Sequence, residues 1–165
     1  MANSAKLKCL PAIVSARTRV LILGSFPGPE SLRREQYYAN TQNHFWKIFS
    51  LESLSYEERK QRLDKAGIGL WDVIDSCRRE GSSDTNIRGC RMNDIGKLVK
   101  EYSAIRTVLL NGKKAGDLFA RLELDVPFKI LPSTSPANAI ISFEEKMDIW
   151  RNALRYALCK DGKHS

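Results

Sequence analysis

Four short runs of apolar residues recur along the chain, and within each run the apolar residues follow one another instead of alternating with polar ones. The runs cover residues 19–23, 67–73, 106–110 and 127–131. Continuous runs of this length are typical of strands that are covered on both faces of a parallel sheet. The pattern therefore predicts four buried strands.

Helical patterns lie between and after these runs. Two of them begin with a capping box, a Ser followed three residues later by a Glu, which is a common helix start. The two boxes are Ser55 with Glu58 and Ser142 with Glu145. The ranges expected to be helical are residues 55–66, 93–102, 113–121 and 142–158. The last range carries a regular apolar stripe, which predicts a helix packed on the core.

Strands that alternate with helices predict an α/β fold, a three-layer α/β/α sandwich on a four-stranded parallel sheet. Residues 1–165 are interpreted as a single domain, because the chain has no linker or repeat and its length suits one core. In such sheets, ligands bind beyond the carboxyl ends of the strands. The site is therefore expected to begin at Gly24, Asp72, Asn111 and Ser133.

Charge changes this picture only slightly. The 165 residues include 27 Lys and Arg against 19 Asp and Glu, a formal net charge of +8. This surplus favours a polyanionic partner, but a solvated basic surface explains it equally well. No apolar stretch approaches the length of a membrane span, and no signal peptide is recognisable, so a cytoplasmic protein without a membrane partner is expected.

The metal-binding residue types are few and scattered. Cys9, Cys77, Cys90 and Cys159 form no C-x-x-C pair, so reduced thiols are expected. The two histidines, His44 and His164, make no ligand cluster. The sequence thus predicts neither a metal nor another cofactor.

Three segments at the predicted strand ends carry unusual composition. Residues 24–28, Gly-Ser-Phe-Pro-Gly, form a tight turn without the glycine pattern of a nucleotide-phosphate loop. Residues 36–46 are dense in aromatic rings and amides, which suits a pocket for a flat heterocycle. Residues 131–139 hold small hydroxyl residues between prolines, which suits contact with phosphates. Each segment alone is equally consistent with an ordinary turn or with core packing.

Together the three segments resemble those of the uracil-DNA glycosylase superfamily, and more narrowly its hypoxanthine-DNA (deoxyinosine) glycosylase family. The resemblance extends from Val20 to about Leu158. It implies a uracil-DNA glycosylase-like sandwich that flips a deaminated base, foremost hypoxanthine, out of double-stranded DNA and hydrolyses the bond between base and deoxyribose. It also implies a monomeric enzyme associated with the nucleoid.

The resemblance assigns roles residue by residue. Relatives carry a polar residue where this chain has Phe26, so the main catalytic side chain is expected to be Asn43, which holds either the water or the base, with Ser25 as a helper for the water. The base-binding residues are then Gly24, Phe26, Phe45 and Asp72, with the ring of Phe45 stacking on the flipped base. The DNA-binding residues are Ser133, Thr134, Ser135, Pro136, Ala137 and Asn138.

Two departures from the superfamily pattern refine the expected chemistry. The segment after the fourth strand lacks the His of the uracil enzymes, so other donors, backbone N–H groups among them, are expected to stabilise the leaving base. No Lys lies within the matched motifs apart from Lys47 just after them, which predicts a monofunctional hydrolase without Schiff-base chemistry. An ionised Asp72 would accept a hydrogen bond from N1–H of hypoxanthine and repel the bare N1 of adenine.

Three alternatives stay open. The first is a glycosylase whose main substrate is uracil, xanthine or another damaged base. The second is a protein that binds DNA without catalysis, which the loss of the polar residue at Phe26 favours. The third is an enzyme that acts on free nucleosides, which would leave residues 133–139 without a groove to enter. The identity of the opposite base is not encoded in these motifs.

Overall fold

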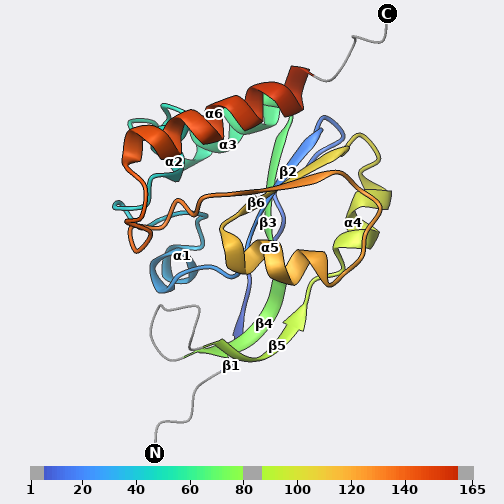
Figure 1. Cartoon of the computed structure of the whole chain (residues 1–165). Helices are drawn as coiled ribbons and strands as arrows, with labels where there is room; N and C mark the ends of the chain where they lie inside the picture. The colour runs from blue at the N-terminus through green and yellow to red at the C-terminus, as the bar shows by residue number, and fades with distance from the viewer. Residues whose placement is uncertain (1–5, 80–86, 160–165) are drawn as a thin grey trace, which may run out of the picture.

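The computed structural model describes residues 6–79 and 87–159, and a four-stranded parallel sheet lies at its centre (Figure 1). The strands, in their order across the sheet, are β3 (Ile68–Asp72), β2 (Val20–Gly24), β6 (Thr107–Asn111) and β7 (Phe128–Leu131). Their bounds lie within one residue of those predicted from the apolar runs. The predicted α/β sandwich on a four-stranded parallel sheet is therefore confirmed.

The two faces of this sheet are covered by different helices (Figure 1). Val20 and Ile22 of β2 pack into one core cluster, whereas Leu21 and Leu23 pack into the other. The first cluster includes residues of α2 (Phe45–Ile48), α3 (Tyr56–Ala66) and α6 (Phe143–Cys159), and the second includes residues of α4 (Ile95–Glu101) and α5 (Lys113–Ala120). Successive side chains of a strand point to opposite faces, and a core cluster covers each face of the sheet here. Every residue of β2 is therefore buried.

Both predicted serine caps form. Ser55 accepts a hydrogen bond from the backbone N–H of Glu58 at 3.2 Å and donates to its carboxylate, which begins α3. Ser142 accepts from the backbone N–H of Glu145 at 3.2 Å at the start of α6. In α6 the apolar stripe is buried, with Trp150 fully enclosed. These local signals positioned both helices because capping depends on neighbours within one turn.

The structure differs from the sequence expectations in two respects. A second, antiparallel sheet is formed by β1 (Lys6–Lys8), β4 (Ile74–Arg79) and β5 (Ile87–Met92), and a short helix α1 (Pro29–Arg34) follows the first turn. These strands are charged and lack the apolar runs that marked the others. In addition, β7, at one edge of the sheet, is not fully buried: Phe128 is 46% exposed and Ile130 is 44% exposed. Within the described ranges, no helix is both long and apolar enough to span a membrane.

Candidate functional site

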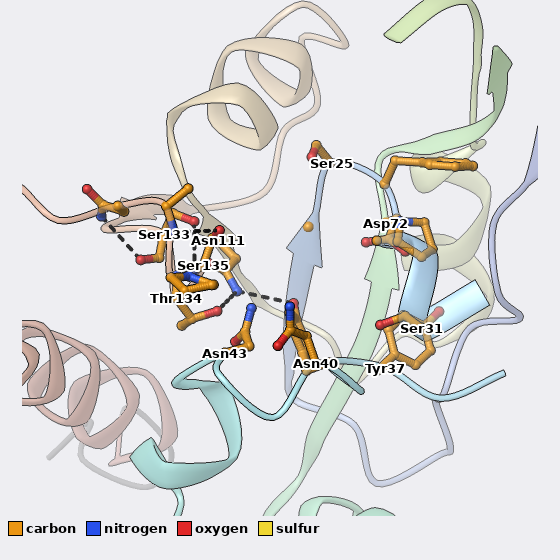
Figure 2. Close-up of a pocket in the computed structure, with 18 of the residues that line it drawn as sticks. Ser25, Ser31, Tyr37, Asn40, Asn43, Asp72, Asn111, Ser133, Thr134 and Ser135 are labelled. Carbon is orange, nitrogen blue, oxygen red and sulfur yellow. Dashed lines mark hydrogen bonds between the residues drawn. The ribbon is translucent and has the colours of Figure 1, made fainter. Parts of the chain in front are cut away.

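A cavity of about 890 Å³ opens at the carboxyl ends of the four parallel strands (Figure 2). Its wall includes the last residues of the strands, the turn after β2, the segment before α2 and the loop after β7. Of the twelve residues named as site residues from the sequence, all except Phe45 line it. The parallel arrangement thus brings together segments that lie far apart along the chain.

Asp72 lies on the side of the cavity formed by β2 and β3. It is paired with Gly24 across the two strands and is only 4% exposed. A Cβ atom on Gly24 would lie 2.7 Å from Asp72 Oδ1, so the absence of a side chain at Gly24 makes room for the carboxylate. The side chain of Asn93 donates to the backbone carbonyl of Asp72 at 2.8 Å and fixes the strand end. A carboxyl group is therefore held at a defined point of the cavity wall.

The turn after β2 is tied to the start of β4. The backbone N–H of Val73 donates to the carbonyl of Gly24 at 2.8 Å, and that of Ile74 donates to the carbonyl of Ser25 at 3.0 Å. Ser25 is 9% exposed and Phe26 is 7% exposed, and both line the cavity. The turn therefore presents a hydroxyl and an aromatic ring from a rigid backbone.

Asn43 is oriented by the start of α2. Its side-chain oxygen accepts from the backbone N–H of Phe45 at 2.9 Å, and its backbone N–H donates to the carbonyl of Asn40 at 2.9 Å. Because a backbone N–H can only donate, the oxygen of the carboxamide has to face it, and the NH₂ group is directed elsewhere. Asn43 thus offers the cavity a donor.

Phe45 does not reach the cavity, which differs from the sequence expectation. Its ring is fully buried and is stacked against Tyr38, with ring centroids 3.9 Å apart and an angle of 17° between the planes. Tyr38 lines the cavity and covers Phe45, so a base would stack directly on Phe45 only after Tyr38 had moved. The sequence did not separate the two rings, because both lie in the same aromatic-rich segment.

Asn111, at the end of β6, connects two walls of the cavity (Figure 2). Its NH₂ group donates to the hydroxyl of Tyr38 at 3.2 Å and to that of Thr134 at 2.9 Å, while its oxygen accepts from the backbone N–H of Thr134 at 2.9 Å. The sequence marked Asn111 only as a strand end. The signal was an amide directly after a buried apolar run, and its partners became apparent only with the strand order.

The loop after β7, residues 133–138, makes most of its hydrogen bonds within the protein. The N–H of Ser135 donates to the hydroxyl of Ser133 at 3.1 Å, and that of Ala137 to the hydroxyl of Ser135 at 3.2 Å. The N–H of Asn138 donates to the carbonyl of Ser135 at 3.1 Å, and that of Thr134 is bound to Asn111. These four N–H groups therefore already have acceptors within the protein.

Side chains beneath the loop hold it in place. Lys146 of α6 is only 1% exposed, and its Nζ donates to the carbonyl of Asn138 at 3.2 Å and lies 3.5 Å from Nδ1 of His44. The backbone N–H of His44 donates to the carbonyl of Thr134 at 3.0 Å, and Trp150 donates to the carbonyl of Pro132 at 2.8 Å. Burial lowers the pKa of Lys146, and burial followed by the charges of Lys146 and Lys47 lowers the pKa of His44.

A lysine from outside the predicted motifs reaches the rim of the cavity. Lys113, the first residue of α5, lines the cavity, has a side chain that is 89% exposed, and lies 3.8 Å from Asp117. The matched motifs hold no Lys apart from Lys47 just after them, but the fold brings Lys113 to the cavity from outside the motifs. Among the residues that the structure describes, no group of three His, Cys, Asp or Glu side chains is arranged to hold a metal ion.

Comparisons with known proteins agree with this geometry. The sequence profile of the uracil DNA glycosylase superfamily matches residues 11–156. The chain is 36% identical over 153 residues to a hypoxanthine DNA glycosylase of Methanosarcina acetivorans, covering 88% of this chain and 96% of the relative. It is 35% identical over 157 residues to a hypoxanthine DNA glycosylase of Methanosarcina barkeri, covering 91% and 99%.

A solved structure matches the fold as well. The solution NMR structure of a Methanosarcina acetivorans protein, provisionally assigned as a uracil DNA glycosylase, superposes with a TM-score of 0.82 at 34% identity. The match covers 93% of this chain and 99% of that protein. The similarity therefore includes the whole sandwich and all the strand ends that form the cavity.

Proposed function

The chain belongs to the uracil DNA glycosylase superfamily, and on this premise we propose that it is a base-excision repair enzyme that removes hypoxanthine from DNA by hydrolysing the bond between base and deoxyribose. The observation that carries the proposal is the cavity at the strand ends, where the buried carboxylate of Asp72 and the amide of Asn43 line one site. The similarity to two hypoxanthine DNA glycosylases over most of their length supports the same substrate.

The base has to leave the DNA stack to reach this cavity. Flipping a base costs a few kcal/mol, and it costs least where the base is mispaired. Hypoxanthine opposite thymine is such a base, because it arises by deamination of an adenine that was paired with thymine. The flipping step therefore provides a first selection before any contact in the cavity is made.

Within the cavity, Asp72 distinguishes the purines. Hypoxanthine carries a donor at N1–H, which a carboxylate accepts, whereas adenine carries a bare acceptor at N1, which a carboxylate repels. A buried polar group that is left unpaired by the wrong substrate can discriminate by several orders of magnitude. The ring of Phe26, which lines the same cavity, provides an apolar surface for the plane of the base.

Asn43 and Ser25 act on the bond that breaks. Negative charge develops on the purine as it leaves, and a fixed donor directed at such charge contributes about 2.7–4 kcal/mol. The carboxamide oxygen of Asn43 already accepts from the backbone N–H of Phe45, so the NH₂ group is the part that is suited to act on the substrate. It donates either to the leaving base or to the oxygen of the attacking water. Ser25 offers a hydroxyl from the neighbouring turn that helps to place the water.

The DNA backbone is bound at the rim of the cavity. The loop of residues 133–138 is rigid and presents its outer surface to the groove, and Lys113 adds a positive charge beside it. Ile140, which follows this loop, is 93% exposed, and apolar side chains in such positions can insert between base steps. The net charge of +8 supports salt-dependent contact with phosphates in addition.

Single-turnover excision from a duplex with one deoxyinosine tests the proposal. The wild-type chain should release hypoxanthine, and Asn43→Ala should slow release by about 100-fold or more, which corresponds to the loss of one fixed donor. Asn152→Ala, at an exposed asparagine of α6, is the matched control and should keep the wild-type rate. Equal rates for wild type and Asn43→Ala would remove Asn43 from the mechanism.

The same assay separates the alternatives. Duplexes with uracil or xanthine at the same position test whether another base is preferred. Free deoxyinosine tests nucleosidase activity, which predicts turnover without DNA and little dependence on salt. Tight binding to the deoxyinosine duplex without release of base by the wild type would instead indicate a DNA-binding protein without catalysis.

A further inference from the structure

Two polar groups converge on one point of the cavity wall above Gly24. A Cβ atom at Gly24 would lie 2.7 Å from Asp72 Oδ1 and 3.6 Å from the hydroxyl oxygen of Tyr38. The carboxylate and the hydroxyl thus border the same small space, and both residues line the cavity. The sequence had assigned a role to Asp72 but none to Tyr38.

The direction of the Tyr38 hydroxyl follows from Asn111. The backbone N–H of Thr134 donates to the oxygen of the Asn111 carboxamide, which leaves the NH₂ group to face Tyr38 at 3.2 Å. An NH₂ group can only donate, so the Tyr38 oxygen is the acceptor in this contact. The proton of Tyr38 therefore points away from Asn111 and is available as a donor.

The environment keeps this donor protonated. Burial, and after it the negative charge of Asp72, raise the pKa of the Tyr38 hydroxyl above its ordinary value. The ring is held against Phe45 by the stacked contact at 3.9 Å, so the hydroxyl has little freedom to leave its position. Tyr38 thus presents a fixed O–H beside a fixed carboxylate.

We propose that Tyr38 is a second base-reading residue, whose hydroxyl donates to the exocyclic oxygen of the flipped base while Asp72 accepts from the neighbouring ring N–H. This inference rests on the proposed function and specifies the ligand edge that the site takes: a carbonyl next to a ring N–H. Asn111 is the positioning residue that directs the Tyr38 proton.

This edge is the chemical result of deamination. Loss of the amino group converts adenine into hypoxanthine and cytosine into uracil; in both cases an amino donor becomes a carbonyl acceptor, and the adjacent bare nitrogen becomes an N–H donor. The Tyr38 donor matches the new carbonyl, and the Asp72 acceptor matches the new ring N–H. The parent base instead presents an amino donor to Tyr38 and a bare nitrogen acceptor to Asp72. The pair therefore recognises the two changes that the lesion introduces.

The same chemistry sets a limit on what the pair can reject. Xanthine carries this edge, and so do the normal bases guanine and thymine. The exclusion of guanine and thymine cannot come from Tyr38 and Asp72. It has to come from the stability of their normal base pairs, which opposes flipping. The site is thus complementary to a class of bases, and pairing in the duplex narrows that class.

The test changes one atom on each side of the contact. Tyr38→Phe keeps the ring on Phe45 and removes the hydroxyl, and 6-thiohypoxanthine keeps N1–H and replaces the oxygen by a weak acceptor. Single-turnover excision of hypoxanthine should fall about 10-fold in Tyr38→Phe, as expected for one hydrogen bond. The wild type should lose a similar factor on the thio base, and Tyr38→Phe should lose little more on it, because the contact is already absent.

Tyr37→Phe is the matched control. The Tyr37 hydroxyl donates to the carbonyls of Leu10 and Pro11 at 3.2 and 2.8 Å, so its removal should leave the ratio between the two substrates unchanged. Additive losses for Tyr38→Phe and the thio base would overturn the inference while leaving the proposed function intact. Failure of the wild type to release hypoxanthine at all would overturn both. An undiminished rate of the wild type on the thio base would also overturn the inference, and this comparison needs no variant.

Discussion

Two regions of the cavity wall differ in where their polar groups lie. In the loop of residues 133–138, most N–H and hydroxyl groups bind one another or neighbouring elements of the protein. In the base-reading wall, which we define as Gly24, Tyr38 and Asp72, the hydroxyl of Tyr38 accepts from Asn111, and it borders, together with the carboxylate of Asp72, the position that a Cβ at Gly24 would occupy. We infer that the first region holds DNA and the second selects the base, so that changes in each should affect different measurements.

Gly24 is the position where a single added atom should disturb the base-reading wall most. In Gly24→Ala the new Cβ would lie 2.7 Å from Asp72 Oδ1, and the carboxylate has to move. A shift of this kind at a reactive site can cost on the order of 100-fold, so we expect hypoxanthine excision to fall by at least that factor, with a cooperative thermal transition retained. Single-turnover rates and thermal melting check this expectation.

Gly28→Ala provides the control for that change. A Cβ at Gly28 meets no atom within 4 Å, and its backbone at φ −70° suits any residue. Its excision rate should stay within about twofold of the wild type. A large loss in Gly28→Ala, or none in Gly24→Ala, would remove the distinction between a base-reading wall and an ordinary turn.

The opposite region is tested at Thr134. Thr134→Val removes a hydroxyl that is 1% exposed and leaves the NH₂ group of Asn111 without that acceptor. An unsatisfied buried group costs about 1–3 kcal/mol, so the thermal midpoint should fall by several degrees and DNA affinity should weaken. The ratio of hypoxanthine to 6-thiohypoxanthine excision should stay constant, with Thr41→Val, at an exposed threonine, as control. A changed ratio would contradict the division of roles.

Lys113 at the rim of the cavity should contribute to DNA binding and not to base selection. Lys113→Gln should weaken DNA binding several-fold and reduce the slope of log affinity against log salt by about 1, with no effect on base preference. Lys114→Gln, at the exposed neighbouring residue, is the matched control and should change the slope less.

Borohydride treatment during turnover should trap no protein–DNA adduct, because we expect hydrolysis without a Schiff base. An adduct that disappears in Lys113→Gln would contradict this expectation.

The smallest expected effect concerns pH and the support beneath the loop. The folded protein lowers the pKa of His44, so the neutral imidazole stabilises the fold above the ordinary pKa of about 6.5, and this contribution is lost as pH falls through the lower folded value. The thermal midpoint should therefore fall between pH 7 and pH 5, and it should fall by a few degrees less in His44→Gln. Identical pH profiles for the two proteins would exclude His44 from the acid response.

Sequence reasoning succeeded where the signal is local. Apolar runs and capping boxes positioned the strands of the parallel sheet and α3 and α6, since each depends on residues within a few positions. It failed for the antiparallel sheet, whose strands are short and charged. Such strands are stabilised by pairing with distant partners, and β1 pairs with β4 across about 70 positions of the chain.

The candidate site shows the same division. Asp72 and residues 133–138 were recognisable as polar strand ends, but the roles of Tyr38 and Asn111 depend on which strands are neighbours and in which register. Phe45 and Tyr38 illustrate the limit, because composition indicates an aromatic wall without indicating which ring faces the cavity. The packing of the two rings in the folded chain supplied that information, since Tyr38 lines the cavity and covers the buried Phe45.

That strand order also determines how the site comes into being during folding. No two neighbouring strands of the sheet are joined by a hairpin, and the base-reading wall combines Gly24 with Asp72, which lies about 50 positions further along the chain. Parallel pairings of this kind close long loops before they gain contacts, which slows folding and makes it cooperative. The ability to excise a base should therefore appear in one step with the native sheet, and partial chains should have none of it.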